Sequence, residues 1–510
     1  MGQSISWTKF TATVLGLSVI IHFIFGFLLD FSVDEAHYAL YAEHLDWSYF
    51  DHPPLVGWIQ FFPVWLNLPD GVIRLIPQLL WLICILISME ISKNLVYIFQ
   101  DSFDQPSLKS VHWWTALILL AAPIMHVLAV GLLPDTLLIA LVPAMILLTL
   151  RISQSQYHTK PQDLHDWIIL GFVLGLSALA KYTSIFFAIG IPVCLMTWHG
   201  LLIFKRPGLW LCLGIAAGLT LPIWIWNYQN DWISFAYQLS HGAGGEWKFS
   251  RIFSFLLNQV ICFGLLSILG IIWTYRRFLQ SPTCLLSFFF IPFIIFTIQS
   301  GGGSSLPHWT SPAWVALAPF GAIGLANAWA MHRRFWIRIF ISLQLGLCLA
   351  GFTFLFFGGV PTVSMHDQLG KKNPIADLYG WSRTGEKLQE LSQLHQTTNL
   401  AVQNWTLGSR TAWYAKPLPV FVLDNRQDQF DLWFGELPIG SSAILLNWSQ
   451  MSFELPIQKN AFEACKSIDA LTINRFGNDL SQFEFFLCKN WQGQSNPMRS
   501  PEKNDEQANK

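Results

Sequence analysis

Long apolar segments separated by short polar ones make up most of the first 357 residues of the chain. A membrane-spanning helix needs about 20 mainly apolar residues. By this measure we predict eleven spans, at 11–29, 72–91, 113–133, 136–150, 167–180, 183–204, 208–226, 252–273, 284–299, 312–330 and 335–357. The segments 136–150 and 167–180 are short, which points to a locally thin bilayer or to helix ends buried in protein. The pattern therefore predicts a polytopic α-helical membrane protein.

The pattern changes near Gly358, where polar residues become frequent. The stretch TGEKLQELSQLHQ has the period of an amphipathic helix, whereas NLAVQNW, LPVFVLD, SSAILLNW and QFEFFLCKN have the composition of strands. About 135 residues of this kind can form one small α/β domain. We predict a transmembrane domain over 1–357, a C-terminal α/β domain over 358–491 and a disordered polar tail over 492–510.

The composition agrees with a membrane protein and excludes some other classes. Only 12% of the residues are charged, against roughly 25% in a soluble domain. The chain has 25 Trp and 41 Phe, as expected where aromatic side chains line two membrane interfaces. A net charge of -1 gives no reason to expect a nucleic-acid partner. Lys9 precedes the first apolar segment without a small-residue cleavage site before Asp30, so we interpret that segment as a span and not as a cleaved signal.

Lysine and arginine predict the orientation, because cytoplasmic loops carry an excess of them. With a cytoplasmic N-terminus, the inner loops hold eleven of these residues and the outer loops before residue 358 hold four, Arg74, Lys181, Lys248 and Arg251. An odd number of spans then places loop 30–70 and the C-terminal domain together on the outer side. Counting 55–69 as a twelfth span would invert this bias, so we interpret it as a helix lying in the membrane interface.

Loop 30–70 holds the polar residues that are hardest to explain without a function. It contains seven carboxylates and no Lys or Arg. Asp34 and Glu35 are adjacent, and because neighbouring side chains point different ways, at most one of them is expected to act as a base. Asp51 and His52 precede a diproline, which stiffens the chain after them. The alternatives are that the first pair caps a helix or marks the membrane edge, and that His52 makes a loop-stabilising hydrogen bond.

The stretch DEAHYALYAEHLDWSYFDHPPLVGW (34–58) resembles the first extracytoplasmic loop of the GT-C glycosyltransferases. More narrowly, it is similar to the bacterial branch related to protein O-mannosyltransferases and to the lipid A aminoarabinose transferase. GLSALAKYTS and PHWTSPAW resemble further segments of that family. The resemblance implies an inner-membrane enzyme with its site facing the periplasm. It would take a sugar from an undecaprenyl-phosphate carrier and transfer it to lipid A, another envelope glycan or a protein.

The chemistry of such a transfer assigns expected roles. Polyprenyl phosphate leaves as an anion, so the reaction needs a base for the acceptor hydroxyl or amine and cations for the phosphate. The resemblance implies Asp34 as the base, and it places an acid at the start of the fourth span, where Asp135 stands. Residues expected to shape or assist the site are Glu35, Asp51 and Asp135, and those expected to bind substrate are His52, Arg74, Lys181, Tyr182, His308 and Trp309.

Lys181 is the main candidate to hold the phosphate, as a point charge. Simple snorkelling is the alternative for Lys181, and an N-cap is the alternative for Asp135. The loop that carries His308 and Trp309 is equally well explained as a tight surface turn. Asp51 and His52 lack the spacing of a metal motif such as HExxH. No cofactor is implied, and a divalent cation stays an open alternative.

Two other classes of protein have to be weighed against an enzyme. A transporter or flippase of lipid-linked saccharide should carry ionisable residues in mid-span, exposed to each side in turn. Here the acids gather at one face, which favours the enzyme. A non-catalytic envelope scaffold gives no reason for that gathering.

Two of the eight cysteines predict a disulfide. Six fall inside predicted spans, whereas Cys465 and Cys488 lie in the predicted outer domain, in an oxidising compartment. A bridge would close a loop of about 23 residues, for which the chain-entropy model gives roughly 3 kcal/mol. The alternative is two reduced thiols that lie too far apart.

Overall fold

A computed structural model describes residues 7–98, 110–155, 164–243, 245–278, 283–303, 305–331, 333–359, 373–424, 426–451 and 461–493. The predicted tail 492–510 lies almost entirely outside these residues. The chain divides into two compact units. The first contains Met1–Gly26, Trp47–Val56 and Arg74–Leu349, and the second contains Phe27–Asp46, Gly57–Ile73 and Ala350–Lys510. The acidic loop is thus shared between the two units, and the predicted boundary at residue 358 stays a prediction.

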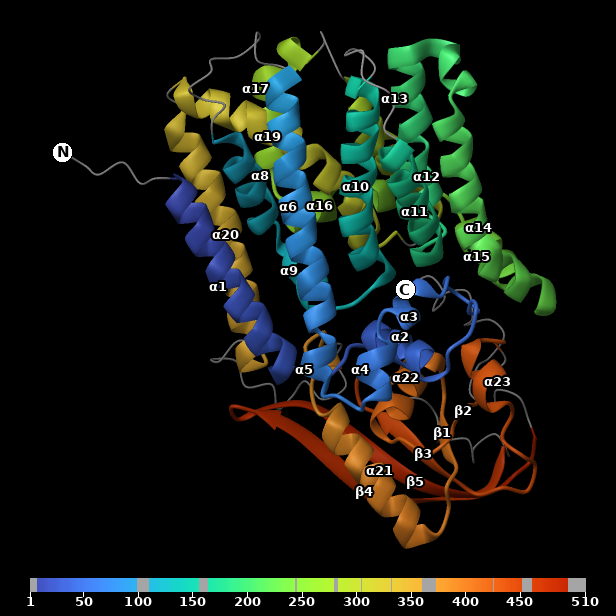
Figure 1. Ribbon diagram of the computed structural model, residues 1–510. Helices are drawn as coiled ribbons and strands as arrows, with labels where there is room; N and C mark the ends of the chain where they lie inside the picture. The colour runs from blue at the N-terminus through green and yellow to red at the C-terminus, as the bar shows by residue number, and fades with distance from the viewer. Residues whose placement is uncertain are drawn as a thin grey trace. The chain divides into compact units, whose positions relative to one another are not determined.

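The first unit is built of helices that lie roughly side by side (Figure 1). They are α1 (Trp7–Leu28), α6 (Leu75–Ile98), α8 (Val111–Leu120), α9 (Pro123–Val130), α10 (Pro134–Ser155), α11 (Leu164–Ala180), α12 (Ser184–Ala188), α13 (Gly190–His199), η1 (Gly200–Lys205), α14 (Pro207–Gln229), α15 (Ile233–Ala243), α16 (Phe249–Phe263), α17 (Leu266–Phe278), η2 (Thr283–Leu286), α18 (Ser287–Gly302), η3 (Pro307–Thr310), α19 (Ser311–Ala330) and α20 (Arg334–Phe357). The last residues of α1 and α20 belong to the second unit.

Every predicted span corresponds to helix, but not every one is a simple span. Among the described residues, eight helices are long and apolar enough to cross a membrane, and two bent pairs raise the number to ten. The remaining segment is Leu164–Ala180, with 17 residues. At 1.5 Å per residue it extends about 26 Å, somewhat less than the roughly 30 Å hydrocarbon core. The expected eleven spans are therefore eight to ten by length and composition.

The two bent pairs break where the backbone cannot continue a helix. The axis turns by 75° between α8 and α9 and by 94° between α16 and Leu266–Trp273. Pro123 begins α9 and lacks an N–H, and Gly264 has a left-handed φ of 74°. Gln344 Nε2 donates to the carbonyls of Ala121, at 3.1 Å, and Phe263, at 3.3 Å. One buried side chain thus satisfies backbone groups at both breaks, as a membrane interior requires.

The second unit is an α/β domain around a five-stranded sheet with the order β2-β1-β3-β5-β4. Strand β1 pairs in parallel with β2 and β3, and β5 pairs antiparallel with β3 and β4. The strands are β1 (Leu400–Val402), β2 (Val420–Val422), β3 (Ala443–Trp448), β4 (Phe462–Arg475) and β5 (Asn478–Trp491). The helices are α2 (Val33–Glu43), α4 (Phe61–Trp65), α5 (Asp70–Ile73), η5 (Ala376–Leu378), α21 (Trp381–His395), α22 (Trp405–Tyr414) and α23 (Gln429–Phe434), and α3 (Leu55–Trp58) straddles the two units.

The predicted elements of the C-terminal domain are confirmed, and the helices η5, α22 and α23 and one strand are added to them. The expected helix is α21, and the four expected strands are β1, β2, β3 and β5. Strand β4 was not predicted. Among the described strands it pairs only with β5, at one edge of the sheet, and many of its side chains are exposed. Its sequence FEACKSIDALTINR is correspondingly polar and lacks a clear alternation.

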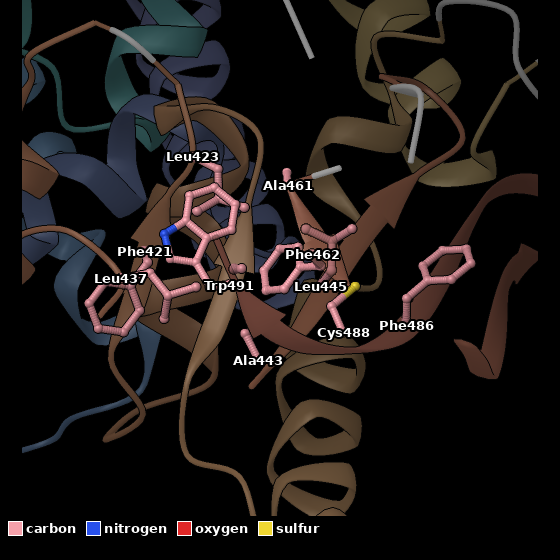
Figure 2. Close-up of a cluster of buried hydrophobic side chains, with 11 residues drawn as sticks. Phe421, Leu423, Leu437, Ala443, Leu445, Ala461, Phe462, Phe486, Cys488 and Trp491 are labelled. Carbon is pink, nitrogen blue, oxygen red and sulfur yellow. The ribbon is translucent and has the colours of Figure 1, made fainter. Parts of the chain in front are cut away.

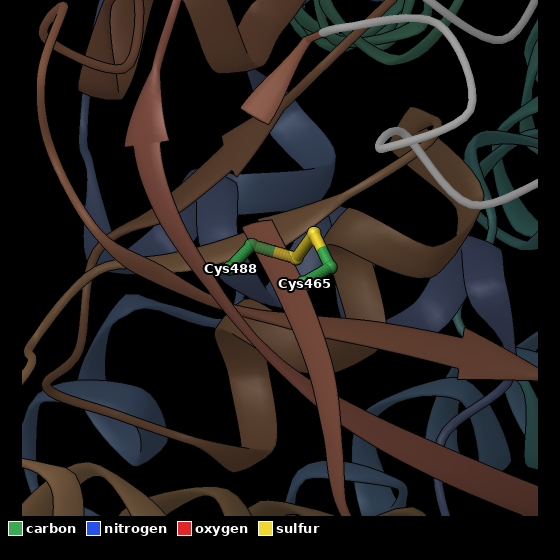
Figure 3. The surroundings of a disulfide bond; sticks show 2 residues. All are labelled: Cys465 and Cys488. Atoms are coloured by element: carbon green, nitrogen blue, oxygen red, sulfur yellow. A yellow bond between two sulfur atoms is a disulfide. The ribbon is translucent and has the colours of Figure 1, made fainter. Parts of the chain in front are cut away.

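One face of the sheet covers an apolar core, which includes Phe421, Leu445, Phe462, Phe486 and Trp491 (Figure 2). Cys488 is part of this core and Cys465 packs against it, and the two lie directly opposite each other on β5 and β4. They form a disulfide (Figure 3). The predicted bridge is confirmed.

The prediction of a single interfacial helix over 55–69 was wrong. The segment forms the short helices α3 and α4, followed by a turn. Asn67 takes a left-handed φ of 50°, which a helix cannot continue. Phe62 and Trp65 on α4 are 68% and 66% exposed. The apolar surface that suggested the membrane interface is therefore present, and its location there stays a prediction.

Candidate functional site

The acidic pair lies in the first turn of α2, in the second unit. Ser32 is the N-cap, and the Glu35 carboxylate accepts hydrogen bonds from the Ser32 N–H at 3.0 Å and from its hydroxyl at 2.9 Å. This is a capping box, the alternative that the sequence left open for the pair. Glu35 is buried, whereas Asp34 is half-buried. The structure therefore gives the two acids different roles, because Glu35 has a local structural role that it does not share with Asp34.

A buried arginine neighbours Asp34 and was not predicted. Arg410 on α22 is fully buried and forms an ion pair with Asp377. Its guanidinium lies 3.9 Å from the Trp381 ring centre and 4.8 Å from that of Trp448. Burial lowers the pKa of Arg410, and the attraction of Asp377 and then of Asp34 opposes this. The only signal in the sequence was a single arginine inside the largely uncharged segment WTLGSRTAWY.

Helix α2 is held against α22 by a second polar contact. His37 Nδ1 lies 3.0 Å from the Ser409 hydroxyl, although the two residues are 372 positions apart in the chain. The His37 ring also packs edge-on against Trp405, with centres 5.3 Å apart. The helix that carries Asp34 therefore belongs structurally to the C-terminal domain, and its position depends on that domain.

Two further acids of the loop have structural partners in the same unit. Asp30 accepts hydrogen bonds from the Trp381 N–H at 2.9 Å and from the Ser382 hydroxyl. Asp70 accepts from Trp413 Nε1 at 3.1 Å and from the Tyr414 hydroxyl at 2.6 Å. Part of the acidic excess in the loop thus serves to attach it to α21 and α22.

A second group of predicted residues assembles in the first unit. Lys181 Nζ lies 2.9 Å and 2.7 Å from the two carboxylate oxygens of Asp135. His308 Nε2 lies 3.6 Å from Asp135 Oδ2, and the Lys181 ammonium lies 5.2 Å from the centre of the Trp309 ring. The Asp135 side chain is 3% exposed and that of Lys181 is 7% exposed. Four of the predicted residues therefore form one cluster.

The burial of Lys181 contradicts the snorkelling alternative, because a snorkelling lysine keeps its ammonium in water. A buried charge of this kind has to be paired, and Asp135 supplies the pair. The cluster therefore presents a nearly neutral ion pair with an imidazole and an indole beside it. Such a group can donate hydrogen bonds to an anion or a sugar.

Helix α15 contacts the segments that carry Tyr182 and Asp51. The Tyr182 hydroxyl lies 2.9 Å from the Ser234 hydroxyl, and Gln238 Nε2 donates to the Asp51 carbonyl at 2.5 Å. Both Ser234 and Gln238 lie on α15. His52 follows Asp51 in the same bend and is half-buried. The structure thus places the Asp51 segment and Tyr182 against one helix of the first unit.

Arg74 occupies a different environment. Its Nη1 donates to the Gly26 carbonyl at 3.1 Å, near the C-terminal end of α1, and the side chain is buried. A cation at this end of a helix is favourable for the helix dipole. This contact gives Arg74 a structural role, and phosphate binding by Arg74 stays a prediction.

An apolar cavity of about 760 Å³ lies between helices α10 to α15. Its lining includes Trp167, Leu174 and Phe235, and it reaches Tyr182 and Ser184, which flank the turn after Lys181. Among the residues with described placement, no group of three or more His, Cys, Asp and Glu side chains could hold a metal ion.

Three comparisons relate the chain to known proteins. Residues 51–226 match the family model of dolichyl-phosphate-mannose-protein mannosyltransferase. The lipid A galacturonosyltransferase RgtD of Rhizobium johnstonii is 23% identical over 337 residues, which is 64% of this chain and 65% of that protein, just under two thirds of its length.

The fold is also that of a solved protein. ArnT from Cupriavidus metallidurans in the apo state superposes with a TM-score of 0.59 and 15% identity, over 94% of this chain and 98% of that one. ArnT bound to undecaprenyl phosphate superposes with a TM-score of 0.56 over the same shares. At this level of identity the likeness establishes the fold.

Proposed function

We propose that the chain is a GT-C-type membrane glycosyltransferase that transfers a hexosyl or pentosyl group from an undecaprenyl-phosphate carrier to a periplasmic acceptor. A lipid acceptor is favoured because one similar protein is named a lipid A galacturonosyltransferase. The donor is suggested by the ArnT structure that holds undecaprenyl phosphate. Other envelope glycans and proteins are the remaining acceptor classes. The protein would lie in a bacterial inner membrane with its site facing the periplasm.

The observation that carries the proposal is the position of a buried cation next to an apolar cavity. The Lys181 ammonium has three N–H donors, and two of them are directed at Asp135, which leaves one for a phosphate oxygen. Tyr182, the residue that follows Lys181 directly, lines the cavity. A polyprenyl phosphate combines a long apolar chain with an anionic head, so it matches both features.

The proposed reaction has one bond-forming and one bond-breaking event at the sugar. The acceptor oxygen or nitrogen attacks the anomeric carbon, and the bond from that carbon to the phosphate oxygen breaks. The electron pair leaves with the polyprenyl phosphate, so no acid is needed at the leaving group. Asp34 takes the proton of the acceptor. The capping box supports Asp34 over Glu35, because the Glu35 carboxylate is the one that holds the helix end.

The test is transfer by purified protein in lipid vesicles, supplied with a panel of undecaprenyl-phosphate sugars and with lipid A, and followed by mass spectrometry. We expect a sugar adduct on one acceptor and a loss of roughly 100-fold or more for Asp34→Asn. Glu35→Gln is the matched control and should retain most of the rate. Movement of the carrier across the vesicle without any transfer would instead support a flippase.

A further inference from the structure

The hairpin formed by β4 and β5 ends in a tip that packs on the end of a membrane helix. The tip joins Arg475 to Asn478 through Phe476 and Gly477, which both have positive φ values. The Phe476 ring lies 5.6 Å from that of Phe356 and 5.3 Å from that of Phe357. These two phenylalanines are the last residues of α20, one of the candidate spans. The tip therefore lies where α20 ends.

The contact is polar as well as aromatic. Arg475 Nε donates to the Phe356 carbonyl at 2.6 Å, and the Tyr379 hydroxyl donates to the Leu355 carbonyl at 2.8 Å. The last carbonyls of a helix have no partner within it, and near a bilayer they need one from elsewhere. The C-terminal domain supplies a partner for the Phe356 carbonyl and a second one for the Leu355 carbonyl, which also accepts from the Gly358 N–H at 3.2 Å. The tip is thus attached to the end of α20 by the Arg475 hydrogen bond, and Tyr379, which lies outside the tip, adds a second one from the same domain.

The apolar residue at the tip is exposed. Phe476 is 63% exposed although it is a large apolar residue. Arg475 lies beside it, with its guanidinium 4.5 Å from the centre of the Tyr379 ring and 5.2 Å from that of Phe476. Aromatic rings and cations at the end of a spanning helix are the composition of a membrane–water interface.

We propose that the β4–β5 tip is a lipid-contact site, with Phe476 inserted at the boundary between headgroups and acyl chains and Arg475 at the level of the headgroups. The partner is the phospholipid surface of the leaflet in which α20 ends. Continuity with α20 favours lipid over a second protein, because the residues on which Phe476 packs complete a candidate span.

The test places the photoreactive residue p-benzoylphenylalanine at position 476 of the full chain in vesicles of phosphatidylethanolamine and phosphatidylglycerol. After illumination, mass spectrometry identifies what is attached. Leu347, on α20 and 45% exposed, is the positive control for lipid contact. Ile439 is the matched negative control, because it is 78% exposed and its neighbour Gly440 bonds to Trp491, at the opposite end of β5.

We expect lipid adducts at position 476 in a yield comparable with position 347 and several-fold above position 439. A yield at 476 no higher than at 439 would overturn the proposal, and so would adducts to protein in place of lipid. The Cys465–Cys488 bridge, checked by non-reducing electrophoresis, shows that each variant has folded. The outcome does not depend on which sugar or acceptor the enzyme uses.

Discussion

The Lys181 ammonium lies within 2.9 Å of both carboxylate oxygens of Asp135, and the two side chains are 7% and 3% exposed. Each charge therefore depends on the other, because an isolated buried charge is costly. A buried pair of this kind adds little stability compared with apolar replacements, but removing one partner is strongly destabilising. Because of this dependence, variants that remove one charge or both charges can distinguish a substrate-binding role of Lys181 from a purely structural role.

Lys181→Gln should destabilise the protein by roughly 3–5 kcal/mol, because it leaves the Asp135 carboxylate buried without its cation. Asp135→Asn combined with Lys181→Gln removes both charges and should recover most of that stability. Transfer activity should stay low in both variants if the ammonium contacts the donor phosphate. Thermal unfolding in detergent and the transfer assay measure the two effects. A double variant with restored activity would show that Lys181 serves stability alone.

Substitution of Glu35 should mainly lower stability, whereas substitution of Asp34 should mainly lower transfer activity. Glu35→Ala removes half of a capping box and should cost about 1 kcal/mol of stability, the usual value for a lost cap. Asp34→Asn should leave the melting temperature nearly unchanged while transfer falls. Both quantities are measured on the same preparations. A stability loss in Asp34→Asn as large as that in Glu35→Ala would assign both acids to the helix end.

Asp428 should make stability depend on pH. It is the N-cap of α23 and accepts a hydrogen bond from the Phe430 N–H at 2.8 Å. Burial, helped by Asp424 and Asp431, raises its pKa from 3.8 to about 7. At a pH between these two pKa values, the folded protein keeps a proton on Asp428 that the unfolded chain has released. The contribution of Asp428 to the free energy of unfolding therefore decreases as the pH rises.

Asp428→Asn keeps the cap but cannot ionise. We expect it to match the wild type near pH 4 and to exceed it above pH 7, by a few kcal/mol at most. Melting temperatures of both proteins across this range measure the difference. Parallel curves would mean that folding does not raise the pKa of Asp428.

The disulfide should stabilise the edge of the sheet. Replacing Cys465 and Cys488 together by serine should cost roughly 3 kcal/mol, because the unfolded chain regains the freedom of the closed loop. Non-reducing peptide mapping of protein from intact membranes verifies the bridge. Cys262→Ser is a suitable control, since that cysteine is unpaired. Two free thiols in such a preparation would contradict the expected oxidising compartment.

The orientation can be measured directly. Reporter fusions after Arg206 and Arg334 should be cytoplasmic, and one after Gly370 should be periplasmic, because the lysine and arginine bias puts the first two in inner loops. A cytoplasmic signal at Gly370 would move the acidic loop and the C-terminal domain to the other side of the membrane. This result would contradict the proposal of a periplasmic acceptor.

Much of the architecture could be predicted from the sequence, because it depends on local patterns. A span is recognised by the length of one apolar segment, and α21 and four strands were recognised by their period and composition. The pairing of Cys465 with Cys488 followed from elimination of the cysteines within spans. Strand β4 was not predicted, because an exposed edge strand needs no regular alternation of apolar and polar residues.

The side-chain partners were decided only by the tertiary structure. Asp135 and Lys181 are 46 positions apart, and His37 and Ser409 are 372 apart, so no local period relates them. Arg410 is buried next to α2 only because the C-terminal domain packs on that helix. Even the capping role of Glu35 required the position at which α2 begins. The sequence determines which segments are apolar and where charges are scarce, whereas the energy of each buried charge depends on the group that the fold places beside it.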